Sequence, residues 1–288
     1  MYNRVFRGPI CVKSCIFAVK MGPQSHCNQL CKYNTKNAPM PYAFQIKWLD
    51  KVDSTNNEIY RQIDSLDNLS VLSARNQFAG RGQRGNKWSA LPGENLTFSI
   101  LLRPGMDVVP EVQVLDQFRV SEISTLAVKD LLSAHGIDSK VKWPNDIYVG
   151  NKKICGMLIE NSLRGKEVSS SIIGIGINVN QTAFDPSLVN PTSMKKLSGE
   201  SYSTEDLLEE FCSLFGKRIP LLSEYAALKE EYLSDLYRRE EIHPYRNLRT
   251  GEIFRGRIID VDGTGLLVVD TLDGRVDKFS FKEIGYII

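Results

Sequence analysis

Residues 140–160 read KVKWPNDIYVGNKKICGMLIE, a pattern that predicts a β-hairpin. Two runs with strand character, Asp146–Val149 and residues 153–160, flank the dipeptide Gly150-Asn151. Such a dipeptide is typical of a tight turn between antiparallel strands. We therefore expect this segment to belong to an antiparallel or mixed sheet.

The hairpin follows a proline that interrupts the preceding strand. Pro144 has no amide hydrogen and a fixed φ, so it cannot pair within a ladder. We therefore expect Asn145 and Asp146 at a bend, where their side chains can face a ligand. Lys142 and Lys153 lie near enough along the hairpin to converge on the Asp146 carboxylate. The alternative is a surface ion pair between Lys142 and Asp146, worth at most about 1 kcal/mol.

Strand and helix patterns surround the hairpin without a regular strand–helix–strand succession. Hydrophobic periodicity predicts strands over residues 43–49, 71–74, 95–102 and 169–179. Helices are expected over 55–63, with Ser54 as the N-cap, over 112–134, and after a capping box formed by Ser203 and Asp206. This mixture predicts an α+β fold in which helices flank a mixed or antiparallel sheet.

The pattern changes after Pro244 to short β segments over residues 253–261, 265–269 and 276–281. Gly-containing turn dipeptides separate them, as in a small SH3-like β-barrel. We therefore predict three parts: an extension over 1–39, a main domain over 40–242 and a small domain over 243–288.

The composition is that of a globular protein. Of 288 residues, 42% are hydrophobic and 24% charged, and six cysteines are too dilute for a disulfide scaffold. No apolar run approaches the roughly 18 to 20 residues that span a bilayer, so no membrane contact is expected. Residues 1–49 carry seven Lys or Arg and no acid, which leaves 29 basic and 34 acidic residues in the rest. That acidic balance argues against nucleic acid as a partner.

Residues 1–39 lack helical or strand periodicity and are expected to form a poorly ordered, basic extension. They hold four cysteines in a C-x3-C-x11-C-x3-C spacing: Cys11, Cys15, Cys27 and Cys31. The alternatives are a zinc site and a transit peptide that directs import into an organelle. We favour a dispensable extension on a cytoplasmic protein, because Met40 directly precedes the first strand-like segment.

Residues 80–85 read GRGQRG and match the letters of a dinucleotide-binding loop. A Rossmann turn leads directly into a helix, whereas this loop continues through Lys87 and Trp88 toward another strand. The loop therefore predicts an anion-binding site made of backbone N–H groups with Arg81, Arg84 and Lys87. Trp88 could stack on a base. The alternative is a solvated turn beside a core tryptophan.

Residues 174–180 read GIGINVN, an apolar strand that ends in asparagines. Two glycines within a strand indicate that a ligand or another backbone lies close to it. Asn178 could read the edge of a base.

Taken in order, these segments resemble the biotin protein ligases over roughly residues 44–286. The motifs that carry the resemblance are Asp53-Ser54-Thr55-Asn56, Gly80-Arg81-Gly82, Lys142-Trp143-Pro144-Asn145-Asp146, Lys153-x-x-Gly156 and Gly174-x-Gly176-x-Asn178. The pentapeptide that begins at Lys142 is highly specific to that family. Because residues 1–43 show no helix-turn-helix pattern, the chain resembles the monofunctional type without an N-terminal DNA-binding domain. The resemblance implies a class II aminoacyl-tRNA synthetase/biotin ligase-like fold with an SH3-like C-terminal domain.

The resemblance implies a two-step activity. Biotin and ATP, with Mg²⁺, give biotinyl-5′-AMP and pyrophosphate, and the biotinyl group then passes to a lysine of a biotin carboxyl carrier protein domain. A lipoate or octanoate ligase of the same fold and a regulator that senses biotinyl-AMP are the alternatives. An unpaired edge of the main sheet could also support a homodimer.

The resemblance also implies site residues. The catalytic ones are Arg81, Asp146 and Lys153, with Asp146 also a candidate Mg²⁺ ligand. Biotin binding falls to Ser54, Thr55, Asn56, Gln77, Gly80, Arg81, Gly82, Lys153 and Gly156. Adenylate binding falls to Arg84, Lys87, Trp88, Lys142, Asn145 and Asn178.

Two loop positions depart from many relatives, because Gln83 and Asn86 stand where arginine is frequent. Either the adenylate is held less firmly there, or Arg84 offsets the lost charge. Cys155 and Cys212 lie within a strand and a helix pattern, so we expect them in the core and not as nucleophiles.

Overall fold

The structure, a computed structural model, describes residues 42–288, with the side chain of Arg84 left aside. The predicted extension over 1–39, its zinc-site alternative and its import alternative lie outside the described residues. Within residues 42–288 no helix has both the length and the apolar character needed to cross a bilayer.

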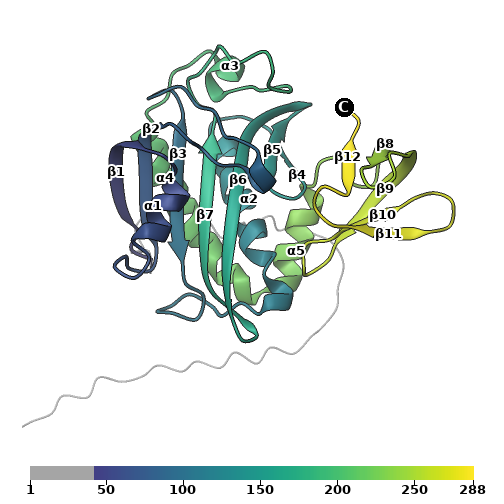
Figure 1. Cartoon of the computed structure of the whole chain (residues 1–288), viewed down its shortest axis with the longest axis horizontal. Coiled ribbons are helices and arrows are strands. Elements are labelled where there is room, and N and C mark those ends of the chain that lie inside the picture. The colour runs from purple at the N-terminus through teal and green to yellow at the C-terminus, as the bar shows by residue number, and fades with distance from the viewer. Residues whose placement is uncertain (1–41) are drawn as a thin grey trace, which may run out of the picture. The chain divides into compact units, whose positions relative to one another are not determined.

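A mixed seven-stranded sheet forms the centre of the main domain, in the order β1-β2-β3-β7-β6-β5-β4 (Figure 1). Only β1 and β2 run parallel, and every other neighbouring pair is antiparallel. The strands are β1 (Gln45–Val52), β2 (Ser70–Gln77), β3 (Leu96–Leu102), β4 (Lys140–Lys142), β5 (Asp146–Val149), β6 (Lys152–Arg164) and β7 (Glu167–Ile177). The predicted hairpin is the β5–β6 pair.

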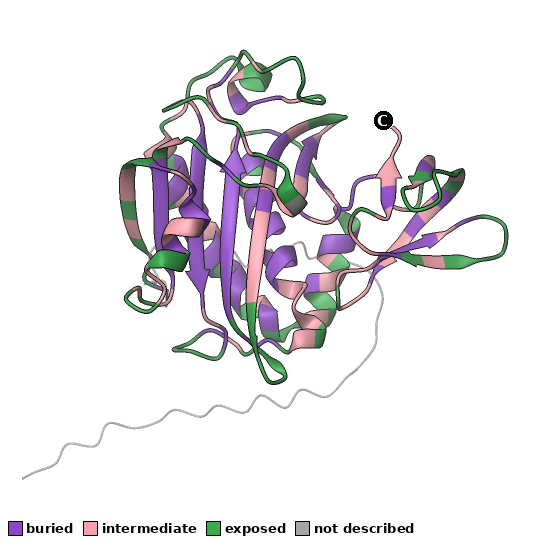
Figure 2. Cartoon of the chain, in the orientation of Figure 1, coloured by how far each residue is buried: buried purple, intermediate pink, exposed green. Residues whose placement is uncertain are grey.

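Helices cover both faces of this sheet, and the strands between them are largely buried (Figure 2). On one face α2 packs against α4 and α5 over the main apolar core. On the other, α1 contributes Ile59 to a smaller cluster with Leu72, Leu101 and Ile172. The helices are α1 (Thr55–Arg61), α2 (Arg119–Ala134), α3 (Met194–Ser198), α4 (Thr204–Arg218) and α5 (Tyr225–Ser234), with short 3-10 turns at Gln83–Gly85, Val114–Asp116 and Ile219–Ser223.

A second, five-stranded sheet follows α5 and is antiparallel throughout. Its order is β11-β10-β9-β8-β12, built from β8 (Ile242–Asn247), β9 (Ile253–Val261), β10 (Leu267–Asp270), β11 (Val276–Phe279) and β12 (Ile284–Tyr286). The α+β fold class, with a mixed sheet flanked by helices and a small SH3-like C-terminal domain, is therefore confirmed.

The helix predicted over 112–134 was wrong in its first part, because α2 begins at Arg119. Residues 112–114 instead pair with the start of β7: Val168 N–H donates to the Val112 carbonyl, and Val114 N–H donates to the Lys166 carbonyl, both at 2.9 Å. These long-range bonds outweigh local helix propensity. The expected cap at Ser203 is present, with its hydroxyl accepting from Asp206 N–H, whereas Ser54 makes no side-chain cap bond.

Glu122 is an acid buried within α2, only 2% exposed, and its Oε2 has no hydrogen-bond partner. Burial raises its pKa to about 7, although Lys229 and Arg119 oppose the shift. Asp260 and Asp116 add to the shift. The side chain therefore holds a proton in the folded protein at mildly acidic pH.

We predict that Glu122 makes the fold less stable as the pH rises. Its unfolded pKa is near 4.5, so the folded state binds the proton more tightly. The protonated Glu122 therefore stabilises the folded state fully below about pH 4.5, and this contribution is lost as the pH rises through about 7. Glu122→Gln should therefore remove on the order of 2–3 kcal/mol of the decrease in unfolding free energy between pH 5 and pH 8. Urea denaturation at several pH values measures the free energy of unfolding of both proteins. The same pH dependence of that free energy in the unaltered protein and in Glu122→Gln would contradict the prediction.

Candidate active site

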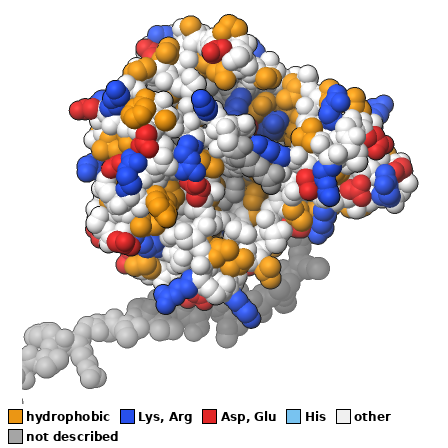
Figure 3. All heavy atoms as spheres, viewed as in Figure 1, with side chains coloured by type: hydrophobic (Ala, Val, Ile, Leu, Met, Phe, Trp, Pro, Cys, Tyr) orange, Lys and Arg blue, Asp and Glu red, His pale blue; other side chains and the backbone are white. Residues whose placement is uncertain are grey.

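A cleft opens beside the loop of residues 80–88, and lysine and arginine side chains surround the hollow in the surface (Figure 3). Segments that are distant in sequence contribute to it: the start of α1, the end of β2, the bend before β5, and the strands β6 and β7. Its cations are Arg81, Lys87, Lys142 and Lys153. Most of the residues expected to bind one ligand therefore meet at one place.

One end of the cleft is a floor of neutral hydrogen-bonding groups. The Gln77 Oε1 accepts from Thr55 N–H at 2.9 Å and from the Thr55 hydroxyl at 3.2 Å. Ser99, fully buried on β3, places its hydroxyl 2.7 Å from Thr55 Oγ1 and 2.6 Å from Asn56 Oδ1. Because Gln77 accepts both Thr55 bonds through Oε1, the nitrogen of its carboxamide points away from Thr55. The sequence did not single out Ser99, because the strand LTFSILL holds two hydroxyl residues and nothing in it distinguishes Ser99 from Thr97.

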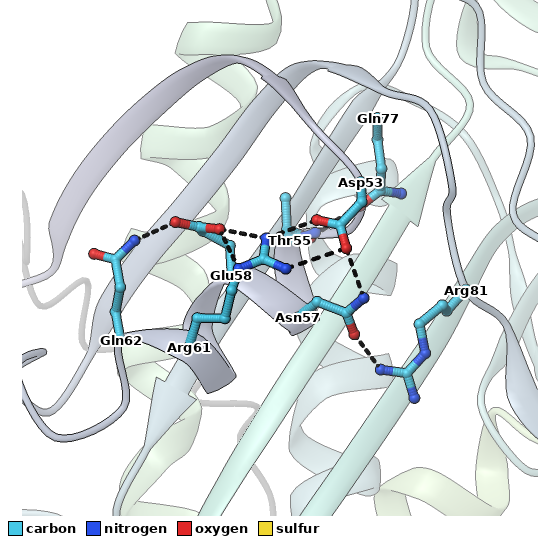
Figure 4. Close-up of polar contacts among 8 residues, drawn as sticks. All are labelled: Asp53, Thr55, Asn57, Glu58, Arg61, Gln62, Gln77 and Arg81. Atoms are coloured by element: carbon cyan, nitrogen blue, oxygen red, sulfur yellow. Dashed lines mark hydrogen bonds and ion pairs between the residues drawn. The ribbon is translucent and has the colours of Figure 1, made fainter.

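The first helix holds the Arg81 guanidinium in place at the mouth of the cleft (Figure 4). Arg81 Nη1 donates to Asn57 Oδ1 at 2.6 Å, and Asn57 in turn donates to Asp53 at 2.9 Å. Asp53 also pairs with Arg61 at 2.7 Å. These two partners hold the pKa of Asp53 well below its usual range. Arg81 Nη2 donates to Glu160 at 2.5 Å.

The two lysines near Asp146 have different partners. Lys153 Nζ lies 2.7 Å from the Asp146 carboxylate. Lys142 Nζ lies 5.1 Å from the ring centre of Tyr148 and 4.5 Å from that of Tyr286, and burial lowers its pKa. The alternative of a surface ion pair between Lys142 and Asp146 is therefore wrong, because Asp146 pairs with Lys153 and Lys142 occupies an aromatic site.

The 80–88 loop and the bend meet across the cleft. Gln83 Nε2 donates to Asn145 Oδ1 at 2.8 Å, and Asn145 Nδ2 donates to the Met157 carbonyl at 3.0 Å. Gln83 thus makes a neutral contact between the two segments.

The C-terminal sheet and α5 also hold the bend. The Trp143 indole N–H donates to the Gly265 carbonyl at 3.0 Å, and the Tyr232 hydroxyl donates to the Pro144 carbonyl at 3.2 Å. Phe281, which follows β11, lines the cleft. The small domain therefore contributes directly to the site.

Trp88 and Asn56 explain the glycines of the sheet. A Cβ atom at Gly176 would overlap the Trp88 indole, one at Gly174 would overlap the Asn56 carboxamide, and one at Gly156 would approach both Trp88 and Lys153. The close neighbours of these glycines in the structure are side chains of the site. The Trp88 Nε1 is buried and has no hydrogen-bond partner.

Most of the expected site residues line this cleft. From the biotin set they are Ser54, Thr55, Asn56, Gln77, Arg81, Gly82, Lys153 and Gly156, and from the adenylate set they are Lys87, Trp88, Lys142 and Asn145. Gly80 borders a neighbouring hollow instead. Asn178 does not line the cleft, because it is buried and its Nδ2 donates to the Thr192 carbonyl at 2.9 Å. The Arg84 side chain lies outside the described part of the structure.

Neither cysteine of the described residues suits nucleophilic chemistry. Cys155 and Cys212 are both buried, and burial raises the pKa of each thiol, that of Cys212 to about 12. The expectation of core positions for both is confirmed.

The close contact between Gly176 and the Trp88 indole leads to a prediction. In Gly176→Ala the added methyl group occupies space now filled by the indole, so the ring must leave its position. Overpacking of this kind costs about 1–3 kcal/mol. Urea denaturation should show that loss, and tryptophan emission should shift to longer wavelength. Gly285→Ala is the control, because its nearest neighbour is the flexible end of Leu248. Equal free energies of unfolding for Gly176→Ala and Gly285→Ala would contradict the close contact between Gly176 and Trp88.

Known proteins resemble the chain in both sequence and fold. The model of the Biotin/lipoate A/B protein ligase family matches residues 48–178. The biotin--[acetyl-CoA-carboxylase] ligase of Paracoccus denitrificans is 29% identical over 79% of this chain and 95% of its own length. The bifunctional ligase/repressor of Bacillus spizizenii is 30% identical over 71% of this chain, which spans 62% of that protein.

Solved structures agree with this assignment at the level of the fold. The biotin protein ligase from Aquifex aeolicus in complex with biotin and ATP superposes with a TM-score of 0.69 at 23% identity, over 84% of this chain and 97% of that one. The family model, the relatives and the fold agree on one similarity: residues 48–178 match the Biotin/lipoate A/B protein ligase family, and the chain is similar to biotin ligases over most of its length.

Proposed function

We propose that this chain is a biotin protein ligase, which forms biotinyl-5′-AMP from biotin and ATP and then transfers the biotinyl group to a lysine of a biotin carboxyl carrier protein domain. One arrangement carries the proposal. A neutral floor at Thr55, Asn56 and Gln77 suits a ureido group, and Arg81 with Lys153 lies where a carboxylate and a phosphate would meet.

The first step requires cations, because it brings a carboxylate to a triphosphate. Two unit charges about 4 Å apart repel by roughly 4 kcal/mol at an effective dielectric near 20. Arg81 and Lys153 would hold the biotin carboxylate, and Lys87 would lie near the phosphates. Trp88, which packs on Gly156 and Gly176 and lines the cleft, would present its ring to the adenine.

Mg²⁺ fits this site only together with ATP. Asp146 is the one carboxylate among the described residues that line the cleft, and residues 42–288 contain no cluster of three acidic, His or Cys side chains. Such a site suits Mg²⁺, which is commonly held by one or two carboxylates plus substrate phosphates. Asp146 would hold the ion, which would neutralise phosphate charge.

The second step requires a neutral lysine from the carrier domain. With a pKa near 10.4, only about 0.1% of such a lysine is neutral at pH 7.4, a cost of about 4 kcal/mol. Asp146 would attract the ammonium group and orient it toward the activated carbonyl. Because its carboxylate already pairs with Lys153, orientation is its larger role.

Two further properties belong to the proposal. We place the protein in the cytoplasm, with import through residues 1–39 as the alternative. We also propose that the protein forms a homodimer through β1. The proposal is supported by the position of β1, an edge strand that pairs only with β2 in the sheet.

ATP–pyrophosphate exchange tests the activation step without a carrier. We expect exchange that depends on biotin and Mg²⁺ and is absent with lipoate or octanoate, because neither of these acids carries a ureido group for the polar floor. Exchange with lipoate or octanoate instead would assign the chain to the other branch of the family. No exchange with any acid, from folded protein, would favour a regulator that only senses biotinyl-AMP.

Asp146→Asn separates biotin binding from carrier biotinylation. It keeps the shape of the side chain but removes the charge that would attract the carrier lysine, so transfer should fall by about 100-fold or more. Biotin binding should stay within about threefold, because Arg81 and Lys153 remain. Calorimetry and a carrier biotinylation assay measure the two effects, and Asp138→Asn, at an exposed site, is the matched control. Unchanged transfer would remove Asp146 from the mechanism.

A further inference from the structure

Glu160 on β6 joins the two ends of the cleft without lining it. Its Oε2 accepts from Asn56 Nδ2 at 2.8 Å, and its Oε1 accepts from Arg81 Nη2 at 2.5 Å. The carboxylate borders the neighbouring hollow and not the cleft itself. From outside the cleft, Glu160 therefore contacts Asn56 of the polar floor and Arg81 of the cationic end.

The contact with Asn56 fixes the direction of a carboxamide. Asn56 Nδ2 donates to both Glu160 and the Leu158 carbonyl, so both of its hydrogens are engaged. Its Oδ1 then faces Ser99, and packs where Gly174 has no side chain. With the amide held this way, the atom of Asn56 that remains for a ligand is an acceptor, which suits an N–H group.

The contact with Arg81 fixes a guanidinium but leaves donors unused. An arginine has five N–H groups in a planar fork, and Glu160 with Asn57 engages one on each terminal nitrogen. The others remain for an anionic ligand. The Arg81–Glu160 pair is 43% and 38% exposed, so it adds little to stability. Its effect is therefore on orientation.

We propose that Glu160 is a positioning residue of this ligase, which holds Asn56 and Arg81 in the geometry that binds biotin at both its ureido and carboxylate ends. This inference rests on the proposed function, since it names biotin as the ligand. Glu160 acts through two other side chains and touches no substrate.

Glutamine cannot replace this glutamate. Both partners donate to the carboxylate, so the position needs two acceptor oxygens. A glutamine offers one oxygen and one NH₂ group, and the NH₂ group would face a donor. Glu160→Gln must therefore release either Asn56 or Arg81 while preserving size and shape. Glu167→Gln is the matched control, because Glu167 is exposed on the paired strand β7.

Calorimetry and exchange kinetics test the proposal. In Glu160→Gln we expect the Kd and KM for biotin to rise about tenfold or more, with the KM for ATP within twofold and thermal stability unchanged. Glu167→Gln should match the unaltered protein in all of these. Equal effects on both substrates, or an unchanged Kd for biotin, would overturn the inference. If the unaltered protein binds no biotin, the proposed function fails instead.

A measurement on the ligand-free protein does not depend on what the chain binds. The NMR signals of the Asn56 side-chain NH₂ group should differ between the unaltered protein and Glu160→Gln, because the carboxylate that accepts from this group is lost. Glu167→Gln should leave these signals in place. Identical Asn56 signals in Glu160→Gln and in the unaltered protein would show that Glu160 does not hold Asn56, which overturns the inference whatever the protein binds.

Discussion

The absence of side chains at Gly174 and Gly176 is the constraint on which the site depends. Both glycines lie in β7, which pairs with β3 on one side and β6 on the other, so this strand cannot move aside. Asn56 fills the space above one glycine and Trp88 the space above the other. A rigid sheet thus provides two niches, and the polar floor and the aromatic wall are formed by the side chains that enter them.

Two irregular segments beside this sheet, the 80–88 loop and the bend before β5, are held by hydrogen bonds between side chains. The 80–88 loop is joined to the bend before β5 through Gln83 and Asn145, and to α1 through Arg81 and Asn57. The Arg81–Asn57 bond is exposed, so its contribution to stability is small. Both bonds instead fix the positions of side chains: the cation Arg81 beside α1, and the uncharged pair Gln83 and Asn145 across the cleft.

Local patterns in the sequence were sufficient for the hairpin, the bend at Pro144 and the small C-terminal domain, because turn dipeptides and a proline act within a few residues. The same local patterns failed at residues 112–118, where pairing with the start of β7 replaces a helix. The sequence analysis also missed Ser99 and Glu160. Their partners lie more than 40 residues away, so only the packing of α1 and of the 80–88 loop on the sheet brings them together. The burial of Asn178 could not be foreseen either, because its side chain bonds to the Thr192 carbonyl, in a segment without strand or helix structure.

The bond from the Trp143 indole to the Gly265 carbonyl crosses from one sheet to the other, and Phe281 adds a wall from the same side. A chain that ended before β8 would retain all seven strands of the main sheet, yet its bend would lose an acceptor and its cleft a side. The two domains are therefore not interchangeable parts. A shift of the C-terminal domain would therefore move the acceptor of Trp143 and one wall of the cleft together, so the position of that domain sets the shape of the site.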